Sequence, residues 1–218
     1  MRPSSRQSFH RYPLTHVLAS GGSVRLLRLL AETGVPLSVS RLARDAGMTP
    51  VGVRSALAAL AKQGVVTTFG QGHARLYALN PAHPMAAPLA ALFAQERSYW
   101  QSLLGDLRDV FARLPSVMAA WLYGSTSRGE DVAGSDLDIA VAVDRDDGPT
   151  VEGVRDALHA IEDRYQVRVS VVTLSRESIL ARAGSDAWWA DVARDAQVLK
   201  GSAPGRFVAQ QSRSSVPA

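Results

Sequence analysis

The sequence predicts an α+β protein of two domains joined by a long helix. The first 80 residues combine three amphipathic helical segments with two short β-rich runs, and the last hundred alternate strands with helices. Charge divides the chain in the same way: residues 1–80 hold ten Arg or Lys against two acids (+8), and residues 117–218 hold 11 against 15 (−4). The two ends are therefore expected to have different partners, a polyanion for the first and a bound cation for the second.

Composition limits the class of protein. The chain has 218 residues, of which 46% are hydrophobic and 20% charged, as in ordinary globular domains. No apolar run approaches the roughly 18 residues that span a bilayer, and no signal-peptide core follows the basic N-terminus, so we expect a cytoplasmic protein with no membrane partner. The sequence contains no cysteine, so any metal must be held by oxygen or imidazole.

Three helices are expected in the first domain, which we place at residues 1–80. Apolar residues recur at helical spacing in residues 23–34, 38–47 and 49–64. Glycine ends the first two segments, and the third begins with Thr49 as N-cap and Pro50 in the first helical position. The short connection between the second and third segments is typical of a helix-turn-helix.

A hairpin is expected behind these helices. Val65–Phe69 and Ala74–Leu79 are β-rich and are joined by a loop with two glycines. The order of elements, and the stretch SVSRLARDAGMTPVGVRSALAALAKQGVV, resemble the winged helix-turn-helix of bacterial regulators of the arsenic-repressor and multiple-antibiotic-resistance types.

This resemblance implies binding to double-stranded DNA, with the third helix in the major groove. Thr49, Arg54 and Ser55 are then the candidates for contacts with base edges, and His73 and Arg75 would lie on the wing. The alternative is that these are solvated residues on a helical module that serves dimerisation. The charge of +8 favours DNA.

Residues 81–116 are expected to connect the two domains. Apolar residues at helical spacing predict one helix over residues 84–114, which at ~1.5 Å per residue would be roughly 40 Å long. Such a helix would bridge the domains and would offer a seam for a homodimer; packing wholly on its own domain is an equally good alternative.

The second domain, placed at residues 117–201, holds two aspartates that face the same way. A buried strand ends at Gly124 and Ser125, and the next strand alternates so that Leu137 and Ile139 lie on one face while Asp136 and Asp138 lie on the other. The aspartate Cα atoms would be about 6.6 Å apart, close enough to share a cation. Without a cation the two carboxylates would repel each other.

The stretch GSTSRGEDVAGSDLDI resembles the signature of the DNA polymerase β nucleotidyltransferase superfamily, in particular its minimal nucleotidyltransferases and the kanamycin nucleotidyltransferase group. The resemblance implies a mixed β-sheet flanked by helices. It also implies that Gly124 and Ser125 hold the triphosphate of a nucleoside triphosphate, and that the catalytic Asp136 and Asp138 bind Mg²⁺, which neutralises charge during transfer.

Other positions near this motif allow more than one interpretation. Arg128 is either a phosphate contact or a solvated loop arginine, and Ser135 is either a phosphate contact or a turn former. The family usually carries a third carboxylate on the next strand, where this chain has Ser170. Since that acid normally serves as base or completes a second metal shell, enzymatic activity is left open while nucleotide and Mg²⁺ binding remain expected.

The remaining segments have structural interpretations. Trp188 and Trp189 are expected to pack a helix on the sheet rather than to stack on a base, and the polar residues 202–218 are expected to be disordered. We therefore expect a DNA-binding transcriptional regulator whose second domain binds a nucleoside triphosphate and Mg²⁺. One alternative is an active nucleotidyltransferase that transfers a nucleoside monophosphate to a protein, RNA or small-molecule hydroxyl; another is an antitoxin-like AMP transferase that acts on a partner protein.

Overall fold

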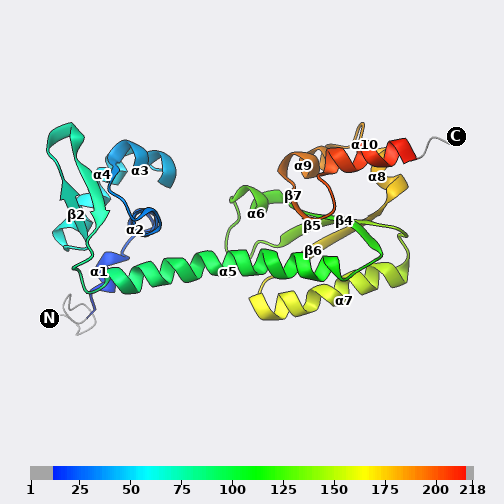
Figure 1. The fold of residues 1–218 in the computed structure, drawn as a ribbon, viewed down its shortest axis with the longest axis horizontal. Helices are drawn as coiled ribbons and strands as arrows, with labels where there is room; N and C mark the ends of the chain where they lie inside the picture. Colours follow the sequence, from blue (N-terminus) through cyan, green and yellow to red (C-terminus); the bar gives the residue numbers. More distant parts are fainter. Residues whose placement is uncertain (1–11, 215–218) are drawn as a thin grey trace, which may run out of the picture. The chain divides into compact units, whose positions relative to one another are not determined.

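The computed structural model describes residues 12–214, and the chain divides between Tyr99 and Trp100 into two compact units (Figure 1). The division falls inside helix α5 (Ala86–Ala112), which corresponds to the helix expected over residues 84–114 and contributes side chains to both units. Pairing of this helix with a second copy stays a prediction. Among residues 12–214, no helix has the length and hydropathy needed to cross a membrane.

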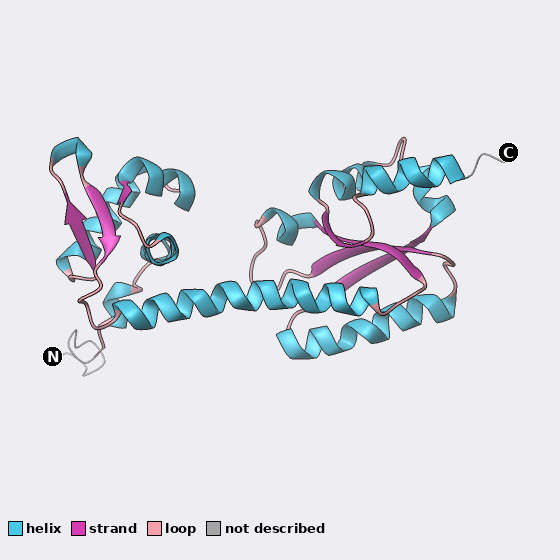
Figure 2. Ribbon diagram, viewed as in Figure 1, coloured by secondary structure: helices cyan, strands magenta, loops and turns pink. Residues whose placement is uncertain are grey.

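From residue 12 to the start of α5, the first unit contains four helices, a 3-10 turn and a small antiparallel sheet of strand order β1-β3-β2 (Figure 2). Its elements before α5 are α1 (Leu14–Val17), α2 (Gly21–Thr33), β1 (Leu37–Ser38), α3 (Val39–Ala46), α4 (Pro50–Lys62), β2 (Val66–Phe69), η2 (Gly72–Ala74) and β3 (Leu76–Leu79). The three main helices and the β2–β3 hairpin confirm the winged helix-turn-helix prediction.

Local sequence sets the ends of these helices. Helix α2 starts earlier than the expected residue 23, because the Ser20 hydroxyl accepts a hydrogen bond from the Ser23 N–H and so caps the helix. Helix α3 ends at Gly47 in the left-handed conformation (φ 61°), and the Thr49 hydroxyl accepts a hydrogen bond from the Gly52 N–H at the start of α4. The short turn between α3 and α4 follows from these two caps.

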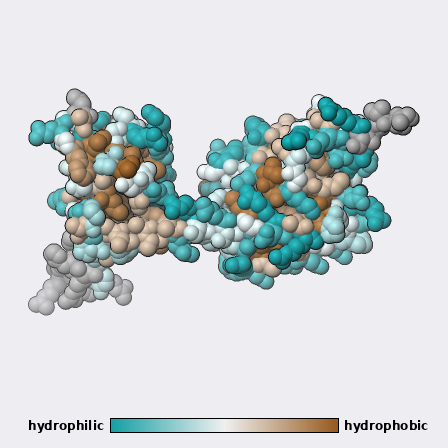
Figure 3. Space-filling model, viewed as in Figure 1, coloured by the Kyte–Doolittle hydropathy of each residue, from teal (hydrophilic) through white to brown (hydrophobic). Residues whose placement is uncertain are grey.

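One apolar core holds the first unit together. Leu27, Leu42 and Leu57, from α2, α3 and α4, are fully buried against one another, and Phe93 of α5 joins them. Arg28 on α2 donates two hydrogen bonds to the Glu96 carboxylate on α5, at 2.6 and 2.8 Å. On the face drawn in Figure 3, hydrophobic residues of this unit gather between hydrophilic ones.

The second unit is a four-stranded mixed sheet of order β6-β5-β4-β7, in which β5 and β6 are parallel and the other pairs antiparallel. After α5, its elements are β4 (Val117–Tyr123), α6 (Gly124–Arg128), β5 (Leu137–Val143), α7 (Gly148–Tyr165), β6 (Val169–Ser175), α8 (Arg176–Arg182), α9 (Ala187–Asp195), β7 (Gln197–Lys200) and α10 (Pro204–Ser214). The sheet and its flanking helices confirm the expected fold class.

Helices cover both faces of this sheet (Figure 1). Leu137, Ile139 and Val141 pack in one core with α5 and α7, as the strand alternation predicts. The opposite face, with Ala140 and Ala142, is also fully buried, in a second core with α8, α9 and α10. Alternation in β5 therefore separates two cores, and Asp136 and Asp138 lie at the strand's entry on the side of the second core.

The expectation of a disordered tail is wrong for residues 204–214, which form α10. Phe207 is buried, and its ring packs edge-on against Trp121 with centroids 5.4 Å apart. Val208, partly buried, packs against the same core, so these two apolar side chains dock an otherwise polar helix on the sheet. Residues 215–218 lie outside the described residues. Trp189 packs against Trp121 from the same side, at 5.7 Å, which confirms its structural role.

Candidate functional site

The two aspartates lie where β4 and β5 meet a short helix. Tyr123, the last residue of β4, pairs with Asp138 near the start of β5, and the chain passes from Tyr123 directly into Gly124 and α6. Asp136 and Asp138 are both half-buried. The structure thus brings the glycine-serine turn and Asp138 together, as the sequence predicts.

Gly124 is required at its position for two reasons. Its φ of +77° lies in the left-handed region, and a Cβ built there would lie 2.7 Å from Asp138 Oδ2. The backbone of the turn therefore approaches the carboxylate more closely than any side chain would permit. Ser125 is half-buried in the first turn of α6, beside this contact.

The Asp138 carboxyl is electrostatically strained. Burial raises its pKa above the ordinary value, and the neighbouring charge of Asp136 raises it further, while a hydrogen bond with Ser170 opposes both effects. A buried carboxylate beside a second carboxylate is stabilised by a bound cation. The electrostatics therefore favour a divalent ion at this point.

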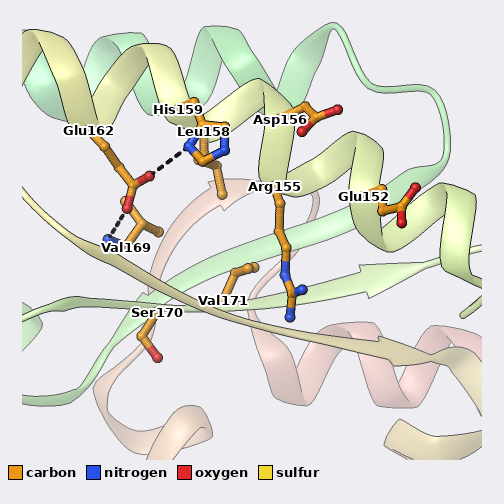
Figure 4. Close-up of a pocket in the computed structure, with 9 residues that line it drawn as sticks. All are labelled: Glu152, Arg155, Asp156, Leu158, His159, Glu162, Val169, Ser170 and Val171. Carbon is orange, nitrogen blue, oxygen red and sulfur yellow. Dashed lines mark hydrogen bonds and ion pairs between the residues drawn. The ribbon is translucent and has the colours of Figure 1, made fainter.

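Ser170 lies where the third carboxylate of the family was expected. In the parallel pairing of β5 with β6, Ser170 is the direct partner of Asp138. Figure 4 shows its side chain pointing away from α7, and its hydroxyl shares a hydrogen bond with Asp138. The absence of an acid noted in the sequence is thus confirmed in the structure, where a neutral hydroxyl lies beside Asp138.

Sequence reasoning missed Arg168. Its Nε lies 2.9 Å from Asp136 Oδ1, and its Nη2 donates a hydrogen bond of 2.9 Å to the Gly134 carbonyl. Arg168 precedes Ser170 by two residues, so the period of a strand would place both on one face. The missing signal was the register between β5 and β6, which a single sequence does not contain.

Two other predicted contacts are engaged within the protein. Arg128 Nε donates a hydrogen bond of 2.7 Å to Glu130, and its Nη1 pairs with Asp195, whose side chain is only 4% exposed. The Ser135 hydroxyl accepts a hydrogen bond from the Val132 N–H, which closes the turn before β5. Arg128 also lines a cavity of about 750 Å³ beside the end of α6.

A second cavity, of about 490 Å³, lies between α7 and β6 (Figure 4). Arg155 and Glu162 reach toward β6 from α7, and Glu162 accepts a hydrogen bond of 2.9 Å from the Val169 N–H. Neither Asp136 nor Asp138 lines this cavity, but Ser170, the strand partner of Asp138, does. Among residues 12–214 there is no group of three or more His, Asp or Glu that could hold a metal.

The predicted DNA contacts occupy the start of α4 and the wing. Arg54 and Ser55 are exposed on α4, and Arg75 is exposed beside β3. The Thr49 hydroxyl is occupied as the N-cap of α4, so Thr49 has a structural role whatever else it contacts. The side chain of His73 lies outside the described residues.

Family models match both units. Residues 23–68 match the IclR helix-turn-helix domain, and residues 106–183 match the polymerase beta nucleotidyltransferase domain. The chain joins these two domains. The first match specifies an IclR-type helix-turn-helix domain at the position where the sequence predicts a winged helix-turn-helix.

Solved structures with some similarity are toxin–antitoxin complexes. A toxin–antitoxin with AMP-PNP is 20% identical over 51% of this chain and 85% of that chain, with a TM-score of 0.37. The MntA-HepT toxin–antitoxin is 18% identical, covering 54% and 85%, with a TM-score of 0.33. A tri-AMPylated Shewanella oneidensis HEPN toxin in complex with MNT antitoxin is 20% identical, covering 54% and 84%, with a TM-score of 0.32. No curated protein matches the chain.

Proposed function

We propose that the protein is a DNA-binding transcriptional regulator whose nucleotidyltransferase domain binds a nucleoside triphosphate together with Mg²⁺. The observation that carries the proposal is the arrangement at the entry of β5: Asp136 and Asp138 stand beside the Gly124 turn, and Ser170 takes the position of the third acid. Two carboxylates and a backbone turn suit the binding of Mg²⁺ and a triphosphate, whereas the position of the acid that would activate an acceptor hydroxyl is held by Ser170.

The residues present suit Mg²⁺. Asp136 Oδ1 is buried without a hydrogen-bond partner among the described residues, and the Asp138 pKa is raised by burial and by Asp136. Mg²⁺ is commonly held by one or two carboxylates and completed by water and substrate phosphates. Asp136 and Asp138 would supply those carboxylates, and the ion would neutralise phosphate charge. Gly124 and Ser125 would hold the triphosphate through backbone N–H groups and the Ser125 hydroxyl.

For the first domain, the support lies in charge and exposure. Arg54 and Ser55 are exposed near the start of α4, the helix that enters the major groove in proteins of this fold. Arg28 and Arg41 pair with Glu96 and Asp45, whereas no acidic partner of Arg54 is found among residues 12–214. Arg54 is the single arginine of α4, and its exposure leaves it available for contact with DNA.

Two measurements on the purified full chain test this function. The protein is incubated with Mg²⁺, cell extract and each of the four radiolabelled nucleoside triphosphates, and its binding to DNA upstream of its own gene is measured across salt concentrations. We expect no labelled acceptor, and a log affinity for DNA that falls linearly with log salt. A labelled protein, RNA or small molecule would instead support the active nucleotidyltransferase; DNA affinity independent of salt would refute the regulator.

A further inference from the structure

Arg168 contacts the candidate metal site with both its main chain and its side chain. The Leu137 N–H donates a hydrogen bond of 2.8 Å to the Arg168 carbonyl, which fixes this residue beside the entry of β5. From there the guanidinium reaches Gly134 and Asp136, each at 2.9 Å. The side chain is nonetheless 75% exposed, so it is held by these contacts and not by packing.

The contact with Asp136 is a charge pair and not a hydrogen bond. Nε lies 2.9 Å from Oδ1, yet Oδ1 has no hydrogen-bond partner among the described residues, because the N–H does not point at it. Oδ1 thus keeps its lone pairs available in a buried position. Such an atom is an acceptor that a better-placed cation would occupy.

The charge of the group differs from that of a site with three acids. The formal charges of Asp136, Asp138 and Arg168 add up to −1, and the neutral Ser170 contributes none. One divalent ion would bring the group to +1, which complements a triphosphate. Three carboxylates would carry −3, which attracts two divalent ions.

We propose that Arg168 is a tethered cation that neutralises Asp136 in the nucleotide-free protein and moves to the triphosphate when a single divalent ion binds the carboxylates. The inference rests on the proposed nucleotide binding and specifies how that site works. The guanidinium presents several N–H donors in a planar fork that matches phosphate oxygens, and its exposure leaves it room to turn. Arg168 would then replace the charge of a second metal ion.

This role predicts opposite effects of one substitution on two ligands. In Arg168→Ala a competitor of the metal is lost, so Mn²⁺ without nucleotide should bind about two- to fivefold tighter, the range of an exposed ion pair. A nucleotide with Mn²⁺ should bind about tenfold weaker or worse, because a charge-assisted contact to phosphate is lost. Arg168→Lys should fall between the unaltered protein and Arg168→Ala.

The experiment uses the full chain, free Mn²⁺ followed by electron paramagnetic resonance, and the tightest-binding of the four α,β-methylene nucleoside triphosphates. Arg155→Ala is the matched control, since it removes the same charge from the opposite side of the sheet. We expect Arg155→Ala to change both affinities less than twofold, and one Mn²⁺ to bind per nucleotide in the unaltered protein.

The outcomes separate the two proposals. Unaltered protein that binds no analogue with Mn²⁺ refutes the proposed function itself. Normal binding by the unaltered protein, combined with two Mn²⁺ per nucleotide, refutes the tethered cation alone. The tethered cation alone is also refuted if Arg168→Ala weakens the binding of Mn²⁺ and of nucleotide alike, or if its affinities change as little as those of Arg155→Ala.

Discussion

Replacing Gly124 by alanine tests whether the turn and the aspartate form one site. The new Cβ would lie 2.7 Å from Asp138 Oδ2 and 3.5 Å from Asp138 Cβ and Cγ. Since the closest atom is the end of a rotatable side chain, the clash is relieved when the carboxylate turns away. The expected damage is therefore to the position of the metal ligand more than to the fold.

The structure supplies a matched control at the other end of α6. Gly129 has a φ of +69°, close to the +77° of Gly124, but a Cβ built at Gly129 would meet nothing within 4 Å. A left-handed alanine costs about 1–2 kcal/mol at either position. Gly124→Ala and Gly129→Ala should thus lower the unfolding free energy similarly, while only Gly124→Ala displaces Asp138.

The assay combines urea unfolding with nucleotide binding. All four tryptophans, at positions 100, 121, 188 and 189, belong to the second unit, so tryptophan fluorescence follows the nucleotidyltransferase domain alone. We expect both variants to lose about 1–2 kcal/mol, and Gly124→Ala alone to bind Mg²⁺ and nucleotide about tenfold weaker or worse. If Gly124→Ala binds nucleotide as well as Gly129→Ala does, the close approach of Gly124 to Asp138 has no functional role.

Three further predictions concern single side chains. The pKa of Asp138 is raised in the folded state, which therefore binds this proton more tightly than the unfolded state, so stability falls as pH rises through the folded pKa. Asp138→Asn should thus raise the urea midpoint of the metal-free protein at neutral pH while abolishing Mg²⁺ binding. An unchanged midpoint would show that the Asp138 carboxylate does not destabilise the fold. Arg54→Ala should weaken binding to specific DNA by about 1–3 kcal/mol in an anisotropy titration, with Lys62→Ala, at the far end of α4, as the comparison; equal losses in the two variants would argue against base contact. Asp195→Ala removes the ion-pair partner of Arg128 and Arg194, and with it the link between the end of α6 and the end of α9. Thermal unfolding of the second unit should then occur at a lower temperature. An unchanged midpoint would show that these ion pairs contribute no net stability.

Periodicity and turn residues predicted the parts of the fold that depend on local chemistry. Thr49 and Gly47 mark the helix-turn-helix because capping needs only neighbours in sequence. Asp136 and Asp138 share a face because a strand alternates. The α10 helix was missed because Phe207 and Val208 dock it on a core that includes Trp121, through contacts between residues far apart in the chain.

The candidate site shows the same division. The Gly124 turn and the two aspartates follow from one short stretch of sequence, and so does the absence of an acid near Ser170. Arg168 could not be assigned, because its place beside Asp136 depends on the pairing of β5 with β6. For Arg128 the sequence allowed a phosphate contact or a solvated arginine; the structure shows its ion pairs with Glu130 and Asp195, and the phosphate contact stays a prediction.

We propose above that Asp136 and Asp138 hold a divalent ion through which a nucleoside triphosphate binds. Isothermal titration of the full chain with each α,β-methylene nucleoside triphosphate, with Mg²⁺ and with a chelator, tests it most directly. We predict that at least one analogue binds only when Mg²⁺ is present, and that the double variant Asp136→Asn, Asp138→Asn loses this binding while tryptophan fluorescence shows a folded domain. Equal binding of the analogue by the double variant, or by the unaltered protein in the chelator, would contradict the claim.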